Sequence, residues 1–280
     1  MSESVQPILV LVSSTAGANP TQFMMERAFA HHDLDWRYIT VEVAQEALAD
    51  ALGGVRAMGF RGGHLADAHK EAAVPLLTRT TEAASAVGAV NFLFREQDEL
   101  VGGNTEGQGV VESLRAVVEP EGKRFLVLGA GRVARAVGFE LSAAGAAEIV
   151  VVDRTPERGQ ALAESLVQKG TAASAVTWKG ALEIPAETDV LIQATTLGRE
   201  DSHDRPPIRV DSLRPELVVA DVTIEPPQTW LLIEAAARGC KQVDGLTMFV
   251  EQAAIAFRQW TGVTPDRQIL RDAVEEFLEL

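Results

Sequence analysis

The stretch GKRFLVLGAGRVARA, residues 122–136, joins an apolar run to a glycine-containing turn and the start of a helix. Gly129 and Gly131 follow the apolar run, where glycine permits a tight turn and lets a pyrophosphate approach the backbone. The N-terminus of the following helix offers N–H groups and the positive end of a dipole to such an anion. The sequence therefore predicts a dinucleotide-binding turn, with a ligand-free strand-to-helix turn as the alternative.

The next segment, EIVVVDRTPER (148–158), bears on the choice of cofactor. Pro156 suits the first turn of a helix, and the run before it is expected to be a strand. Asp153 is placed to accept hydrogen bonds from adenosine ribose hydroxyls, which favours NAD. Arg154 and Arg158 flank it and are suited to a 2′-phosphate, which favours NADP, unless Arg158 is only a solvated helix residue. The residues alone leave both cofactors open.

Short β-branched runs alternate with amphipathic stretches along all 280 residues. This alternation predicts an α/β fold built on parallel sheets. We expect two domains: an N-terminal α/β substrate domain, residues 1–107 plus 250–280, and a C-terminal Rossmann-type dinucleotide-binding domain, residues 108–249.

Three local expectations accompany this division of the chain. Residues 70–89 are expected to be mostly helical, and AVNFLFRE (89–96) is expected to pair with ELVGGN (99–104) as a hairpin. Thr264 and Pro265 are expected to cap the last helix.

The composition excludes several classes of function. The net charge is −15 and the chain has one cysteine, so nucleic acid, an anionic membrane surface, an internal disulfide and a cysteine-rich metal site are not expected. The N-terminus lacks the basic region and the long apolar run of a signal peptide. We expect a cytoplasmic protein that acts on a small molecule, as a monomer or a homodimer.

Three glycine-flanked stretches of the first domain carry candidate chemistry: GGHLADAHK (62–70), GAVN (88–91) and GGNTEG (102–107). Together they offer Lys70, Asn91, Asn104 and Glu106. A lysine oriented by a carboxylate can pass a proton to, or stabilise, an alkoxide that forms during hydride transfer, and amides can bind ring hydroxyls. The alternative for Lys70 is an ordinary surface lysine.

These stretches, in this order, resemble the shikimate dehydrogenase family. GAVN with ELVGGNTEGQG is similar to G-A-V-N-T and G-x-L-x-G-x-N-T-D-x-x-G, and HLADAHK to N-V-T-x-P-x-K. VLGAGRVARA and DRTPER resemble the cofactor motifs G-A-G-G-x-x-x-A and N-R-T-x-x-R. DVLIQATTLG and DGLTMFVEQAAIAFRQWTG are similar to two further family motifs. The resemblance implies an NAD(P)-dependent dehydrogenase of the kind used in aromatic amino acid biosynthesis.

The resemblance implies a role for each matching residue. Lys70 and Glu106 fall on the catalytic lysine and aspartate, and Arg154, Thr155 and Arg158 fall on the NADP phosphate clamp, so NADP is preferred with NAD as the alternative. Candidate substrate contacts are Asn91, Asn104, Gln252, His64, Ser14 and Asn19. Candidate cofactor contacts are Gly129, Ala130, Gly131, Arg132, Val133, Asp153, Arg154, Thr155, Arg158, Ala194, Thr195, Thr196, Gly245 and Met248.

The departures from the family pattern concern the substrate. Gly17 and Asn19 stand where the family holds the shikimate carboxylate with two serines, although Ser13, Ser14 or Thr15 are possible replacements. The catalytic aspartate is Glu106, which is longer by one methylene. Loss of several charge-assisted hydrogen bonds costs a few kcal/mol, at about 1.5–3 kcal/mol each. We expect hydride transfer between the nicotinamide and a ring secondary alcohol, either shikimate/3-dehydroshikimate or a related polyhydroxylated cyclic acid, with an unrelated substrate as the alternative. The departures predict that shikimate is a poor substrate or not the physiological one.

Two rival functions and two minor features remain. A non-catalytic dinucleotide-binding sensor is the first rival, and a folate or amino-acid dehydrogenase is the second. No metal site is expected, because His64 and His69 lack a third ligand at suitable spacing. Residues 199–207 are expected to form a polar surface loop, with a lid over the cofactor as the alternative.

Overall fold

A computed structural model describes residues 6–15, 17, 19–198 and 205–280. Contacts divide the chain into two compact units, the first made of Met1–Thr105 with Ala253–Leu280 and the second of Glu106–Gln252. Glu106, expected in the first domain, is therefore the first residue of the second unit. Within the described ranges no helix is both long and apolar enough to cross a membrane.

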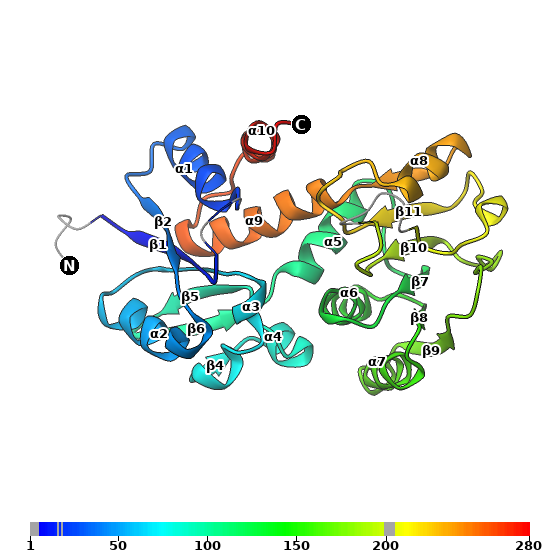
Figure 1. The fold of residues 1–280 in the computed structure, drawn as a ribbon, viewed down its shortest axis with the longest axis horizontal. Helices are drawn as coiled ribbons and strands as arrows, with labels where there is room; N and C mark the ends of the chain where they lie inside the picture. Colours follow the sequence, from blue (N-terminus) through cyan, green and yellow to red (C-terminus); the bar gives the residue numbers. More distant parts are fainter. Residues whose placement is uncertain (1–5, 16, 18, 199–204) are drawn as a thin grey trace. The chain divides into compact units, whose positions relative to one another are not determined.

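The second unit is built on a six-stranded sheet in the order β12-β11-β10-β7-β8-β9, in which all neighbours are parallel (Figure 1). The strand order reverses direction beside the first strand in the chain, as in doubly wound dinucleotide-binding sheets. The strands are β7 (Arg124–Leu128), β8 (Glu148–Asp153), β9 (Ala172–Thr177), β10 (Val190–Gln193), β11 (Val218–Asp221) and β12 (Lys241–Val243).

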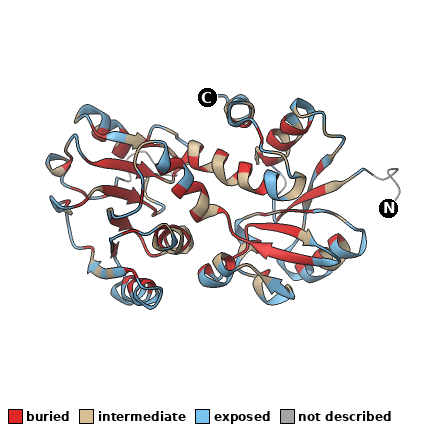
Figure 2. Cartoon of the chain, turned by 180° about the vertical axis from the view of Figure 1, so that it is seen from behind, coloured by how far each residue is buried: buried red, intermediate tan, exposed pale blue. Residues whose placement is uncertain are grey.

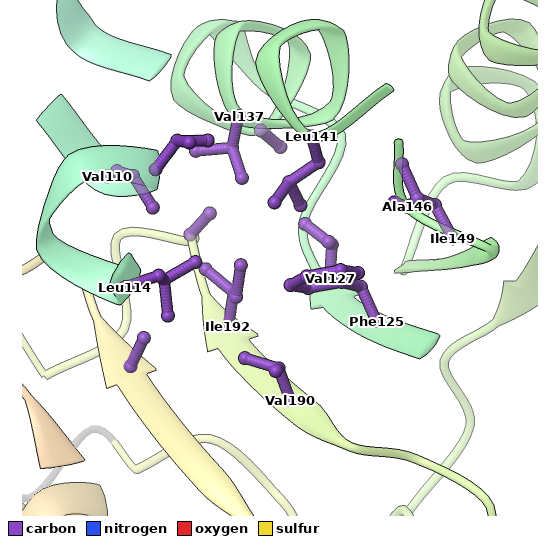
Figure 3. Close-up of a cluster of buried hydrophobic side chains, with 14 of the residues drawn as sticks. Val110, Leu114, Phe125, Val127, Val137, Leu141, Ala146, Ile149, Val190 and Ile192 are labelled. Atoms are coloured by element: carbon purple, nitrogen blue, oxygen red, sulfur yellow. The ribbon is translucent and has the colours of Figure 1, made fainter. Parts of the chain in front are cut away.

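Helices cover both faces of this sheet, so its central strands are buried throughout. They are α5 (Glu106–Arg115), α6 (Arg132–Ala143), α7 (Pro156–Gln168) and α8 (Trp230–Ala237), with the start of α9 (Gly245–Thr261) and a short 3-10 turn, η3 (Val210–Ser212). Figure 3 shows Val110 and Leu114 of α5 pointing toward Ile192 of β10, in a cluster that also holds residues of β7 and α6. A second cluster joins the opposite face of the sheet to α8.

The first unit is built on a mixed six-stranded sheet in the order β2-β1-β3-β5-β6-β4. β1, β2 and β3 are parallel, and β5 and β6 form the expected antiparallel hairpin. The strands are β1 (Ile8–Ser13), β2 (Arg37–Glu42), β3 (Gly62–Leu65), β4 (Arg79–Thr80), β5 (Phe92–Glu96) and β6 (Glu99–Gly103). The helices are α1 (Thr21–His31), α2 (Leu48–Ala57), α3 (Asp67–Lys70), α4 (Glu82–Val87) and α10 (Arg267–Phe277), with 3-10 turns η1 (Gln45–Ala47) and η2 (Val74–Leu76).

β1 lies between β2 and β3 in the sheet, and its residues 9–13 are buried, as the burial colours of Figure 2 illustrate. Val10 and Val12 point to the face covered by α2, where they join a cluster with Leu52 and Val55. The second half of α9 packs on β5 and β6 of the same unit. There the Trp260 indole N–H donates to the Leu93 carbonyl at 2.8 Å. The chain end therefore completes the core of the unit that contains the chain start.

Some local expectations were wrong. Residues 70–89 are not mostly helical: α3 ends at Lys70, η2 is a single 3-10 turn, α4 covers only Glu82–Val87, and the remaining residues form turns and the short strand β4. The last helix is capped by Asp266, whose carboxylate accepts from the N–H groups of Gln268 and Ile269, and not by Thr264 or Pro265. The glycine-containing sequence after Glu106 did not predict a helix, although α5 begins at Glu106.

Candidate functional site

The turn between β7 and α6 has the geometry that a dinucleotide requires. Gly129 has φ of 103°, and a Cβ on it would lie 2.9 Å from the carbonyl oxygen of Ala194. No other residue type fits this position without strain. Gly131, in an extended conformation, precedes the first turn of α6. The first N–H groups of a helix are not used in its own hydrogen bonds, so they can bind an anion. Residues 129–133 therefore form a glycine turn and helix start of the kind that binds phosphate in dinucleotide-binding folds, and their contact with a cofactor stays a prediction.

Asp153, at the end of β8, holds this turn in place. One carboxylate oxygen accepts from the Ala130 N–H at 2.7 Å, and the other accepts from the Thr155 N–H at 2.8 Å. The residue is only 9% exposed. Because both oxygens bind backbone donors, this carboxylate organises the loop, and its contact with the ribose hydroxyls stays a prediction.

The arginines that were expected at the phosphate clamp lie beside the same turn. Arg154, Thr155 and Arg158 are exposed. Nη2 of Arg158 lies 3.5 Å from the position that a Cβ on Gly131 would take, so the guanidinium lies over the glycine turn. Two exposed guanidinium groups beside a buried, internally bonded carboxylate suit a 2′-phosphate better than a free ribose hydroxyl.

The remaining cofactor candidates lie at the ends of β10 and β12. Ala194, Thr195 and Thr196 follow β10, where the Thr195 hydroxyl donates to the Gln193 side chain at 3.0 Å. Gly245 begins α9, and a Cβ there would lie 2.5 Å from the carbonyl carbon of Thr223, so the helix start approaches the backbone after β11 closely. These turns share the carboxyl-end edge of the parallel sheet, where doubly wound folds bind ligands. Met248, 5% exposed, belongs to the core cluster.

Glu106 is the first residue of α5, and its side chain is only 9% exposed. Oε2 of Glu106 lies 3.5 Å from Nε of Arg132, the first residue of α6. Close packing of the two helices creates this ion pair: a Cβ on Gly107 would lie 2.5 Å from the carbonyl carbon of Ala136. The glycine after Glu106 is therefore needed for helix packing, and the carboxylate is held beside the dinucleotide turn.

Lys70 is the last residue of α3 and its side chain is 14% exposed, so it is not an ordinary surface lysine. Its Nζ lies 2.8 Å from Oδ1 of Asp67, three residues earlier. Lys70 and Glu106 therefore each have an ion-pair partner within their own unit, while the pairing of Lys70 with Glu106 stays a prediction. The i, i+3 spacing of Asp67 and Lys70 was a signal that sequence reasoning missed.

His64, on β3, forms a polar cluster with two aromatic residues of the first unit. Its Nδ1 lies 2.7 Å from the hydroxyl oxygen of Tyr38, and its ring meets the Trp260 ring edge-on at 4.9 Å between centroids. Burial, and then the positive charge of Lys70, lower the pKa of His64 from 6.5 to about 3. Burial also raises the pKa of Tyr38, so a neutral phenol and a neutral imidazole share this hydrogen bond.

The two candidate amides both hold the segment between β6 and α5. Asn91 donates to the Thr105 hydroxyl at 3.0 Å and accepts from the Thr105 N–H at 2.9 Å. Asn104 donates to the Ala89 carbonyl at 3.1 Å. Both amides are 4% exposed. These bonds give them a structural role that the sequence did not predict, and their contact with substrate stays a prediction, as does that of Gln252 on α9.

The N-terminal candidates bond to their own backbone. The Ser13 hydroxyl donates to the Thr15 carbonyl at 2.7 Å, and the Asn19 side-chain oxygen accepts from the Thr21 N–H at 2.9 Å, at the start of α1. Ser14 is exposed. His69 is fully buried, with Nε2 2.9 Å from the Val43 carbonyl oxygen. Residues 199–204 of the expected polar loop lie outside the described residues.

Comparison with known protein families identifies the chain's relatives. The sequence matches the shikimate dehydrogenase substrate binding domain over residues 18–93, the shikimate / quinate 5-dehydrogenase family over 113–200, and the shikimate 5'-dehydrogenase C-terminal domain over 245–275. It is 36% identical over 253 residues to the shikimate dehydrogenase (NADP(+)) of Thermococcus kodakarensis, covering 90% of each chain.

The chain also resembles solved structures of two enzymes with different names. The ligand-free 5-ketofructose reductase of Gluconobacter sp. strain CHM43 is 38% identical, with a TM-score of 0.94 over 98% of this chain and 99% of that one. The shikimate 5-dehydrogenase of Thermus thermophilus, in complex with NADP(H) and shikimate, is 33% identical, with a TM-score of 0.85 over 97% and 100%. The chain belongs to the shikimate dehydrogenase family of NAD(P)-dependent oxidoreductases.

Proposed function

We propose that the chain uses NADP to interconvert a secondary alcohol and a ketone on a neutral polyhydroxylated substrate, a keto sugar of the 5-ketofructose type. The observation that carries the proposal is the N-terminal segment, where the family motif has two serines for a carboxylate. Here Gly17 lacks a side chain, and the Ser13 hydroxyl and the Asn19 oxygen bond to the local backbone. A substrate without a carboxylate does not need the missing donors.

Energetics and charge support a neutral substrate. Each charge-assisted hydrogen bond contributes about 1.5–3 kcal/mol, so loss of two donors weakens carboxylate binding by roughly 3–6 kcal/mol, or about two to four orders of magnitude. The net charge of −15 adds an unfavourable field for an anion. The likeness to the 5-ketofructose reductase, at 38% identity, points to the same substrate class.

The dinucleotide turn described above fits NADP. Residues 129–133 would hold the pyrophosphate, while Arg154, Thr155 and Arg158 would hold the 2′-phosphate. Bound NADPH supplies a hydride, which is the chemistry of nicotinamide cofactors.

Lys70 is the proposed proton donor. Nζ of Lys70 would protonate the carbonyl oxygen as negative charge develops on it, a contribution of about 10²–10⁴ in rate. Asp67, at 2.8 Å, orients the ammonium. In the tautomer in which Nδ1 accepts from the Tyr38 hydroxyl, neutral His64 would donate from Nε2 to a substrate hydroxyl.

Shikimate is the second candidate substrate, because the curated relative from Thermococcus kodakarensis is a shikimate dehydrogenase (NADP(+)) that matches over 90% of both chains. Initial rates with NADPH distinguish the two. We expect kcat/KM for 5-ketofructose to exceed that for 3-dehydroshikimate by at least about 100-fold, from the two missing donors. A higher value for 3-dehydroshikimate would overturn the neutral-substrate proposal.

A gain-of-function variant sharpens this comparison. Gly17→Ser with Asn19→Ser restores both hydroxyls of the family motif, and a Cβ on Gly17 meets nothing within 4 Å. Serine at position 19 also keeps a side-chain oxygen near the Thr21 N–H that Asn19 now binds. The double variant should improve kcat/KM for 3-dehydroshikimate and leave that for 5-ketofructose within about threefold. No improvement would show that these positions do not select against the carboxylate.

A further inference from the structure

Two residues that depart from the family motifs lie beside each other in the second unit. Glu106 stands where the family has an aspartate, and Arg132 stands where the motif G-A-G-G-x-x-x-A has its last glycine. Oε2 of the glutamate and Nε of the arginine are 3.5 Å apart. An aspartate at position 106 is shorter by one carbon–carbon bond, about 1.5 Å. The longer side chain is therefore what brings the carboxylate to the arginine.

The position of Arg132 gives this ion pair a second possible partner. Arg132 is the first residue of α6, directly after the glycine turn of residues 129–131, and its side chain is 22% exposed. A pyrophosphate held at this helix start would bring anionic oxygens near the first turn of α6, which begins with Arg132. A guanidinium binds phosphate and carboxylate through the same N–H groups. The carboxylate and the phosphate therefore compete for one cation.

We propose that Arg132 is a positioning residue that couples cofactor binding to the charge of Glu106. Without cofactor, Arg132 holds the Glu106 carboxylate. When the dinucleotide phosphates bind, they would take up part of the guanidinium and weaken its hold on the Glu106 carboxylate. The inference rests on the NADP binding proposed above, and it links the electrostatic environment of Glu106 to an occupied cofactor turn.

The separation of 3.5 Å supports an exchangeable pair. It is longer than the 2.7–3.2 Å of a well-formed N–H···O hydrogen bond, so this contact is mainly electrostatic. Energetic coupling between two sites typically changes a binding affinity by about 5- to 150-fold. We expect a change in NADP+ affinity near fivefold here, because the arginine is partly exposed.

The test is a double-mutant cycle on the dissociation constant of NADP+, measured by isothermal titration calorimetry on the full chain. Glu106→Gln should tighten binding about fivefold. In the Arg132→Gln background, the same Glu106→Gln change should have no effect on the constant. Arg132→Lys should retain part of the coupling, because it keeps the charge without the planar fork.

Glu112→Gln is the matched control. Glu112 lies on the same helix, is 44% exposed and pairs with Arg115, so the variant removes the same charge without touching Arg132. NADP+ affinity should be unchanged in this variant. If the Arg132→Gln variant does not fold, the NADP+ affinities of Glu106→Gln and Glu112→Gln are sufficient to test the proposal.

Three results would overturn the proposal: no tightening in Glu106→Gln, equal tightening in Glu112→Gln, or the same effect of Glu106→Gln with and without Arg132. The measurement uses binding and not turnover. A chain that binds NADP+ with the expected coupling but does not reduce neutral ketones contradicts the proposed function alone. Failure of the unaltered chain to bind NADP+ overturns both.

Discussion

Replacement of Gly107 by alanine tests the close packing that places Glu106 beside the dinucleotide turn. The added Cβ would clash with the carbonyl oxygen of Ala136, lie 2.5 Å from its carbonyl carbon and lie 2.8 Å from Cγ of Glu140. The Ala136 atoms belong to the backbone of α6 and cannot rotate away. Because ordinary contact begins near 3.4 Å, α5 and α6 must separate by about 1 Å.

The expected cost follows from this overlap. Overpacking of a well-packed core destabilises by about 1–3 kcal/mol. For a domain of about 150–250 residues each kcal/mol lowers Tm by about 2–4 °C, so Gly107→Ala should lower Tm by about 2–12 °C. Far-ultraviolet circular dichroism during heating measures this shift, because it reports the loss of helix.

Gly53→Ala is the matched control for this prediction. Gly53 lies inside α2, and a Cβ on it meets nothing within 4 Å. Alanine there should stabilise by about 0.5–1 kcal/mol, because it favours the helix over the unfolded chain. A Gly107→Ala variant that melts at or above the temperature of the unaltered chain would refute the packing argument, particularly if Gly53→Ala behaves as expected.

Three further predictions concern the site. Lys70→Met should lower kcat by about 10²–10⁴ while NADP+ affinity stays within about twofold. Asp67→Asn should lower kcat by a smaller factor. Steady-state assays measure kcat and titration calorimetry measures the affinity, and a fully active Lys70→Met variant would contradict the proton-donor role. Asp153→Asn should weaken NADP+ binding and lower Tm, because one of the Ala130 and Thr155 N–H groups then faces an amide NH₂. The expected loss of stability is about 1–3 kcal/mol. Unchanged Tm and affinity would show that the loop does not need the carboxylate. The pKa of His64 is about 3 in the folded chain and 6.5 in the unfolded chain, so between these values the unfolded chain binds one more proton. The stability contributed by neutral His64 is therefore complete above pH 6.5 and is lost as the pH falls toward 3. Tm measured from about pH 4 to 8 should therefore fall more steeply on the acid side for the unaltered chain than for His64→Asn, and identical profiles would count against a neutral, buried imidazole.

The sequence was sufficient to predict features that depend on local backbone pattern. The strand–glycine–helix order of residues 122–136 predicted the parallel dinucleotide-binding sheet, and the six ordered motifs predicted the family. Gly129 was identifiable because its φ of 103° can be adopted readily only by glycine. These properties are encoded by neighbours along the chain, so periodicity and motif spacing reveal them.

Only the tertiary structure decided how the charged side chains are used. The sequence suggested a ribose contact for Asp153, and the structure adds that its two oxygens bind the N–H groups of Ala130 and Thr155. The pairing of Glu106 with Lys70 stays a prediction, and the structure adds that α5 and α6 pack so closely at Gly107 that the carboxylate lies near Arg132. The physical reason is that a side chain's partner depends on which elements pack together, and residues far apart in the sequence meet only when helices and strands dock.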